Sequence, residues 1–138
     1  MAIFIDTGIF VAFHNTRDKN HERAIEIIKA IASGQHGAAY TSDYVFDEAV
    51  TVTLTRTRRR DVALRLGEML LGIEIQPFVT ILNLDEGAFR ASWHLFTAIT
   101  DRGLSFTDCT SLALLKAHGI EYLASFDTDF DGLVPRIS

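Results

Sequence analysis

The hydrophobic pattern of the chain changes repeatedly between a short, strand-like form and a longer, helical one. Short β-favouring runs occupy residues 2–5 and 120–125, as expected of strands with both faces buried. Residues 17–34 instead carry apolar side chains at spacings of three and four, with charged residues between them, which is typical of an amphipathic helix. The apolar stripe of this helix is Ala24, Ile27, Ile28 and Ile31.

Caps and breakers predict the remaining elements. The expected helices lie at residues 9–13, 59–71, 85–101 and 104–119, and the expected strands at 38–41, within 73–83 and at 133–137. Pro77 places the strand within 73–83 near an edge of the sheet. Asp18 or Asn20 can cap the helix at 17–34, and Gly119 fits the position just past the helix at 104–119.

Residues 42–57 fit two interpretations. Apolar residues alternate with threonine over residues 50–55, which favours a strand. Ser42 is a good N-cap, however, and helical spacing joins Val45, Glu48, Ala49 and Val52, so we expect a helix. With a helix here the order becomes β-α-α-β-α-α-β-α-α-β-turn-β, which predicts an α/β fold with a parallel sheet and helices on both faces. No repeat or linker divides the chain, so we expect one domain over residues 1–138.

Composition narrows the class of protein. The 138 residues are 48% apolar and 22% charged, as in ordinary globular proteins. Cys109 is the only cysteine, which excludes an internal disulfide and a multi-cysteine zinc site and fits a cytoplasmic, reducing environment. We expect no signal peptide and no membrane span. The net charge of −5 argues against binding nucleic acid by bulk charge, but allows a nuclease whose acids hold divalent cations.

Four acids occupy comparable positions in this order. Asp6 follows the first strand, Asp127 follows the strand at 120–125, Asp108 opens the helix at 104–119, and Glu48 lies near the start of another helix. In a parallel sheet these positions meet at one rim, where ligands bind. Each acid alone is commonly an ordinary loop or first-turn charge. Together they repel one another unless a hard cation such as Mg²⁺ or Mn²⁺ neutralises them, and such a metal activates water and stabilises phosphate charge.

Parts of the sequence match motifs of three other protein classes, and each of these matches is rejected. Asp6-Thr7-Gly8 spells the DTG of aspartic proteases, which need paired aspartates in an all-β framework. A strand followed by Asp6 is similar to haloacid-dehalogenase phosphatases, but those need a second Asp where Gly8 stands. The first half of an EF-hand loop matches the run from Asp127 to Gly132, but the twelfth position is Ser138 and no exit helix follows.

The successive motifs nevertheless resemble one family. FIDTGIFVAF, the segment with Asp18 and His21, SDYVFDEAVT, SFTDCTSLAL and LASFDTDFDGL are similar, in order and spacing, to the motifs of PIN-domain ribonucleases, most closely the VapC toxins of toxin–antitoxin pairs. The resemblance implies a PIN-like (flavodoxin-like) three-layer α/β/α sandwich with an acidic, metal-holding pocket. It also implies a helix at residues 42–57.

The resemblance assigns roles residue by residue. The family's catalytic and metal-binding acids fall on Asp6, Glu48, Asp108 and Asp127, with Asp129 as an alternative or supporting fourth acid. Its hydroxyl companions fall on Thr7 and Thr107. The implied activity is Mg²⁺- or Mn²⁺-dependent hydrolysis of RNA phosphodiesters by a toxin that forms a homodimer and is covered by an antitoxin. The alternative is a non-catalytic module whose acids hold a structural cation or a basic partner.

Two further groups of residues stay open at this point. Arg56, Arg58, Arg59 and Arg60 form the only basic cluster, which is either a solvated turn between helices or an RNA-binding edge that grips phosphates. Phe89, Trp93 and Phe96 share one side of the helix at 85–101, which favours the core or a partner interface over a base-stacking platform.

Overall fold

The computed structural model describes all 138 residues. Its five strands are β1 (Ala2–Ile5), β2 (Ala38–Ser42), β3 (Thr80–Leu82), β4 (Tyr122–Ala124) and β5 (Arg136–Ile137). Its helices are α1 (Thr7–His14), α2 (His21–Ala32), α3 (Asp43–Thr57), α4 (Arg60–Leu71), α5 (Glu86–Ala98) and α6 (Phe106–His118), with a 3₁₀ turn, η1, at Thr128–Phe130. The element order is the one predicted.

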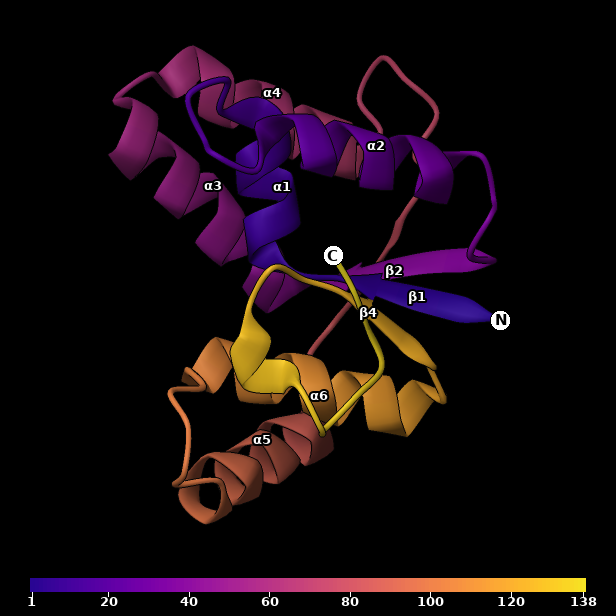
Figure 1. The fold of residues 1–138 in the computed structure, drawn as a ribbon, viewed down its shortest axis with the longest axis vertical. Helices are drawn as coiled ribbons and strands as arrows, with labels where there is room; N and C mark the ends of the chain where they lie inside the picture. The colour runs from indigo at the N-terminus through magenta and orange to yellow at the C-terminus, as the bar shows by residue number, and fades with distance from the viewer.

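All strand pairs are parallel, and their order across the sheet is β3-β2-β1-β4-β5. Figure 1 shows α1 to α4 on one face of this sheet and α5 and α6 on the other. The three-layer α/β/α sandwich is therefore confirmed. The strand order is that of the first five strands of a Rossmann sheet, so the likeness to flavodoxin holds for the layers rather than for the order. The crossovers change faces between β1 and β4, which makes the carboxyl ends of these two strands the switch point.

The central strand explains why the sheet forms where it does. Ile3, Phe4 and Ile5 of β1 have no exposed surface, because helices cover both faces of this strand. A short strand buried on both faces needs an uninterrupted apolar run, as its sequence has. The predicted stripe of α2 is buried as well: Ala24, Ile27, Ile28 and Ile31. Seven of the thirteen residues of α6 are buried, because α6 lies between the sheet and α5.

The segment with two interpretations is a helix. Ser42 caps α3 by accepting a hydrogen bond from the backbone of Val45, 3.0 Å long. Thr53 is buried while Thr51 and Thr55 are exposed. The Thr55 hydroxyl donates to the carbonyl four residues earlier, which a helix provides. Tertiary packing and the cap outweigh the strand propensity of threonine and valine here.

Several expected boundaries were wrong. Within residues 73–83 only Thr80–Leu82 pairs as a strand, at the sheet edge as predicted, because the segment before it forms a loop around Pro77. Neither Asp18 nor Asn20 caps α2 with its side chain, since Asp18 instead accepts from the backbone of Asn20 at 2.8 Å. The helix expected at 85–101 ends at Ala98, and the last strand shortens to Arg136–Ile137.

The aromatic residues of α5 are not in the core. Trp93 is 55% exposed, Phe89 47% and Phe96 41%. Of the two expectations for these side chains, burial in the core is therefore wrong. In addition, none of the six helices has both the length and the apolar character needed to span a bilayer.

Candidate active site

Asp6 stands at the first position after β1, and the sheet itself puts it there. Its backbone N–H continues the ladder by donating to the Ala124 carbonyl at 3.0 Å. Because Ile5 pairs with Ala124, the residues that follow, Asp6 and Ser125, lie side by side at the switch point. The Ser125 hydroxyl donates to Asp6 Oδ2 at 2.7 Å, which fixes the direction of the carboxylate. Only 5% of Asp6 is exposed.

The same serine also positions the next acid. Ser125 Oγ accepts from the backbone of Asp127 at 3.0 Å. Asp127 Oδ1 in turn accepts from the backbone of Asp129 at 2.9 Å, which leaves Oδ2 without a hydrogen bond. The turn after β4 therefore presents Asp127 beside Asp6.

Asp108 enters the site from α6. It forms a reciprocal capping box with Ser105: the Asp108 backbone donates to Ser105 Oγ at 3.0 Å, and the Ser105 backbone donates to Asp108 Oδ2 at 2.9 Å. The first-turn role is thus real, and it coexists with a place in the site because Oδ1 of Asp108 makes no hydrogen bond. Glu48 enters from α3, and its side chain forms no hydrogen bond within the protein.

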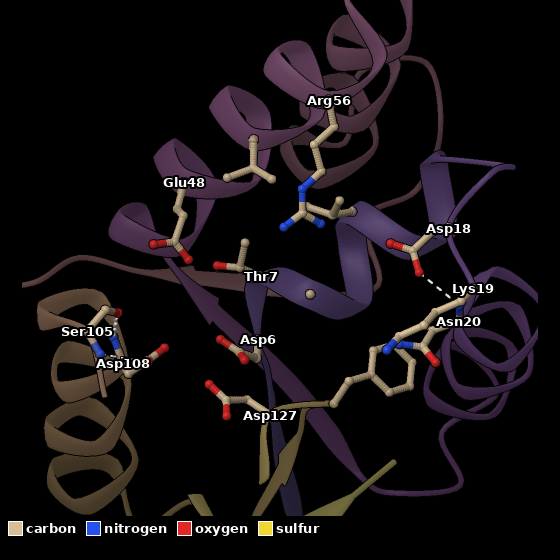
Figure 2. Close-up of a pocket in the computed structure, with 14 residues that line it drawn as sticks. Asp6, Thr7, Asp18, Lys19, Asn20, Glu48, Arg56, Ser105, Asp108 and Asp127 are labelled. Carbon is tan, nitrogen blue, oxygen red and sulfur yellow. Dashed lines mark hydrogen bonds between the residues drawn. The ribbon is translucent and has the colours of Figure 1, made fainter. Parts of the chain in front are cut away.

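These acids share one cavity of about 590 Å³. Figure 2 shows Asp6, Glu48, Asp108 and Asp127 directed towards a common space, with Thr7 among them. The complete lining is Asp6, Thr7, Gly8, Val11, Asp18, Lys19, Asn20, Glu48, Val52, Arg56, Ser105, Asp108, Phe126 and Asp127. None of the four acids forms a salt bridge, although Lys19 and Arg56 stand at the same cavity.

The electrostatic cost of this arrangement falls on the two buried aspartates. Burial raises the pKa of Asp6 to about 7, with further contributions from Asp108 and Glu48, against the lowering effect of the Ser125 hydroxyl. Burial also raises the pKa of Asp108, and Asp127 and Glu48 add to it, while the hydrogen bonds to Ser105 oppose it. The cavity therefore favours positive charge at its centre.

Comparison with known proteins places this geometry in a family. The profile of the PIN domain matches residues 3–133, nearly the whole chain. The chain belongs to the PIN-domain family.

Two relatives match this PIN domain over most of their own length. A VapC ribonuclease from Archaeoglobus fulgidus is 28% identical over 131 residues, which cover 94% of this chain and 80% of that protein. The 23S rRNA-specific endonuclease VapC20 from Mycobacterium tuberculosis is 28% identical over 128 residues, with 93% and 91% covered.

Solved structures agree with the sequence matches. The crystal structure of Mycobacterium tuberculosis VapC20, described as a Sarcin-Ricin loop cleaving toxin, superposes with a TM-score of 0.82 at 25% identity, covering 95% of this chain and 94% of that one. The crystal structure of VapBC2 from Rickettsia felis, bound to a promoter DNA fragment, superposes with a TM-score of 0.69 at 12% identity. The match covers 99% of this chain and 98% of that one, and it shows a shared fold.

Not every predicted site residue lies in the PIN-domain cavity. Thr7 does, but Thr107 does not, and Ser105 supplies the second hydroxyl at the rim. Asp127 lines the cavity, whereas Asp129 turns its carboxylate towards Gly103. Of the arginines only Arg56 reaches the cavity; Arg58, Arg59 and Arg60 lie outside it.

Ser125, Asp18 and Lys19 were missed as site residues by sequence reasoning. Ser125 could have been found, because it follows one central strand just as Asp6 follows the neighbouring one, and parallel pairing brings such residues together. The sequence singled out Asp18 only as a possible helix cap and as part of a family-like segment, and nothing marked Lys19. Both residues reach the cavity from the loop before α2.

The donor set suits a hard divalent cation. All four acids offer carboxylate oxygens, which are the ligands of Mg²⁺ and Mn²⁺. The Thr7 hydroxyl is buried in the cavity wall and has no hydrogen-bond partner in the protein, which leaves it free for a ligand or a water. No three acidic, histidine or cysteine side chains already have the spacing of one ion's ligand sphere. The four acids could hold an ion here directly or through waters, which Mg²⁺ commonly keeps.

The raised pKa of Asp6 predicts an unusual pH dependence in EDTA. Because the folded protein holds the Asp6 proton up to about pH 7 and the unfolded chain loses it near 3.8, the free energy of unfolding falls as pH rises through this window. The expected loss is about 2–4 kcal/mol for a fully buried group. Urea unfolding of wild type and Asp6→Asn at pH 5 and pH 8 measures it, since Asn does not titrate.

His14 makes this comparison between variants necessary. Burial and Arg65 lower the pKa of His14 to about 4, so its contribution rises with pH, opposite to that of Asp6. His14 is present in both proteins and cancels in the difference. An equal pH dependence in wild type and Asp6→Asn would contradict the assignment to Asp6.

Proposed function

We propose that this PIN domain is a divalent-metal-dependent ribonuclease that hydrolyses RNA phosphodiester bonds, and that it is the toxin of a toxin–antitoxin pair. The observation that carries the proposal is the convergence of Asp6, Glu48, Asp108 and Asp127, from four separate elements, at the switch point of a PIN fold. The absence of any salt bridge to these acids supports a cation as their partner. Similarity to VapC ribonucleases over nearly the full chain supports RNA as the substrate.

The proposed metal ligands are the four acids, acting directly or through water. Hydrogen bonds from Ser125, Ser105 and Asp129 each fix one oxygen of Asp6, Asp108 and Asp127, which sets the direction of each carboxylate. A bound Mg²⁺ or Mn²⁺ would supply the positive charge that activates a water and stabilises the phosphate. We leave Asp129 out of the proposed set, because its carboxylate lies towards Gly103 and outside the cavity lining.

The remaining cavity residues suit a phosphodiester. Thr7 Oγ1 can donate to a phosphate oxygen or orient a ligand water, because it has no partner in the protein. Lys19 and Arg56 stand at the same cavity, where they can bind the flanking phosphates of an RNA strand. Val11 of α1, which is buried, lines the cavity beside these polar groups.

A non-catalytic module is the alternative. In that case the acids hold a structural cation or a basic partner, and no bond is cut. The cavity geometry fits either role, so the distinction rests on activity.

Cleavage of a mixed RNA pool in Mn²⁺ tests the proposal. Wild type should cleave in Mn²⁺ and not in EDTA, and Asp6→Asn should lose more than about 100-fold, because it removes a charged ligand rather than an outer-shell contact. Asp129→Asn is the matched control: it removes one charge from a neighbouring acid outside the cavity, so most activity should remain. Equal cleavage by wild type and Asp6→Asn would reject the enzyme.

The similarity to VapC ribonucleases also leads us to propose two partners. One is a second copy of this chain, which forms a homodimer, and the other is an antitoxin that covers the acidic cleft with a basic side chain. The exposed aromatic face of α5 supports a protein interface. Trp93 and Phe96 stack with centroids 5.9 Å apart, and Phe89 packs edge-on to Phe106 at 5.5 Å. Aromatic side chains gathered on a surface favour protein contacts.

Solution mass tests the dimer. At micromolar concentration the protein should have twice the 15.4 kDa chain mass, and Trp93→Glu should shift it to the monomer because it buries a charge in the α5 face. Leu64→Glu is the control, since Leu64 on α4 is equally exposed at 55% but lies apart from the aromatic face. A wild-type monomer would contradict the homodimer.

A further inference from the structure

A second cavity, of about 400 Å³, adjoins the acidic one. It lies where the end of α1 and the loop after it face the end of α3 and the start of α4. Its lining is His14, Asn15, Thr16, Arg17, Arg56, Thr57, Arg59, Val62 and Arg65. Four arginines and no acid line it, in a chain whose net charge is −5. We call it the arginine cavity.

The arginines are only partly neutralised. Asp61 pairs with both Arg59, at 2.6 Å, and Arg65, at 3.3 Å. Arg17 and Arg56 form no salt bridge and no side-chain hydrogen bond. Four positive charges therefore face one negative charge outside the lining. Burial is the main cause of the lowered pKa of His14 in the cavity wall, and the charge of Arg65 adds to it.

Hydrogen bonds fix the backbone on both walls of the arginine cavity. Arg58 ends α3 in the left-handed conformation, with φ of 55°, and so turns the chain sharply before α4. Thr57 fixes the turn: its hydroxyl donates to the Thr53 carbonyl at 2.7 Å and accepts from the Arg59 backbone at 3.2 Å. On the other wall, Asn15 accepts from the Arg17 backbone at 3.1 Å. The turn separates Arg59, which faces the cavity, from Arg58 and Arg60, which do not.

Arg56 joins the two cavities because it lines both. In Figure 2 it extends from α3 above the acids, on the same helix as Glu48. An RNA strand with one phosphate bound at the acids would therefore pass Arg56 before its next phosphates reach the arginine cavity. The neutral side chains of Asn15 and Thr16, on the wall that follows α1, can add hydrogen bonds to phosphate oxygens.

We propose that the arginine cavity is a phosphate subsite that holds the RNA backbone next to the bond being cut. This rests on the proposed ribonuclease function. The guanidinium fork matches two oxygens of a phosphate, and a cluster of such forks without carboxylates in the lining selects anions. The subsite gives an acidic protein a local means of gripping RNA, and it directs the strand from α4 across Arg56 to Asp6.

Binding of a labelled single-stranded RNA, measured by fluorescence anisotropy in EDTA so that the probe is not consumed, tests the subsite. Arg65→Gln and Arg17→Gln should each weaken binding about three- to tenfold and lower the salt dependence of log K by about 0.7. Arg90→Gln is the matched control: Arg90 pairs with Glu86 at i,i+4, 3.2 Å apart, as Arg65 pairs with Asp61, but it lies on α5. Because Arg17 has no ion pair to lose, its variant tests the site without disturbing a contact.

The outcomes are distinct from those of the activity assay. Loss of RNA binding in the two cavity variants, with Arg90→Gln unchanged, supports the subsite even if wild type proves unable to cleave in Mn²⁺. Unchanged binding in both cavity variants overturns it even if wild type cleaves. Equal losses in all three variants overturn it in favour of bulk charge. Weaker binding of a polyglutamate peptide with unchanged RNA binding overturns it in favour of an acidic protein partner.

Discussion

The burial of a carboxylate at the end of the central strand is the constraint on which the site depends. Asp6 cannot move to solvent, because its backbone is part of the sheet ladder and its position follows β1 directly. Leaving water raises the pKa of this group, and the neighbouring acids add to the cost. The protein supplies hydrogen bonds from hydroxyl and backbone groups but no salt bridge. A fold that accepts this cost without a compensating arginine leaves the compensation to something that binds.

Acidic and basic side chains occupy separate regions around Asp6. The acids come from the ends of β1 and β4 and the starts of α3 and α6, all at one rim because the sheet is parallel. The arginines come from the opposite end of α3, the turn into α4, α4 itself and the loop after α1. Glu48 and Arg56, two turns apart on α3, belong to the two regions, so one helix orders both. A net charge of −5 hides this separation, so the net charge does not describe the local charge at either cavity.

The sequence predicted what short-range patterns determine. Apolar runs and caps identified the strands, and Ser42 correctly outweighed the threonine alternation of α3. The relation of Asp6, Asp108 and Asp127 also followed, because a parallel sheet puts such positions on one rim. The directions of the side chains could not be predicted from the sequence. Asp127 and Asp129 lie in one turn, and only the η1 geometry decides which faces the cavity. The arginine cavity brings the loop after α1 against the end of α3 and the start of α4, which are far apart in the sequence, so no local pattern could reveal it.

Metal-dependent thermal unfolding tests the central claim that the four acids form one cation site. In EDTA, Asp6→Asn should be at least as stable as wild type, because it removes a buried charge while keeping an acceptor for Ser125. Mn²⁺ should stabilise wild type and Asp129→Asn by about 1–3 kcal/mol at saturation, and Asp6→Asn much less. Equal metal-induced shifts in wild type and Asp6→Asn, or a large loss of stability for Asp6→Asn in EDTA, would contradict the account.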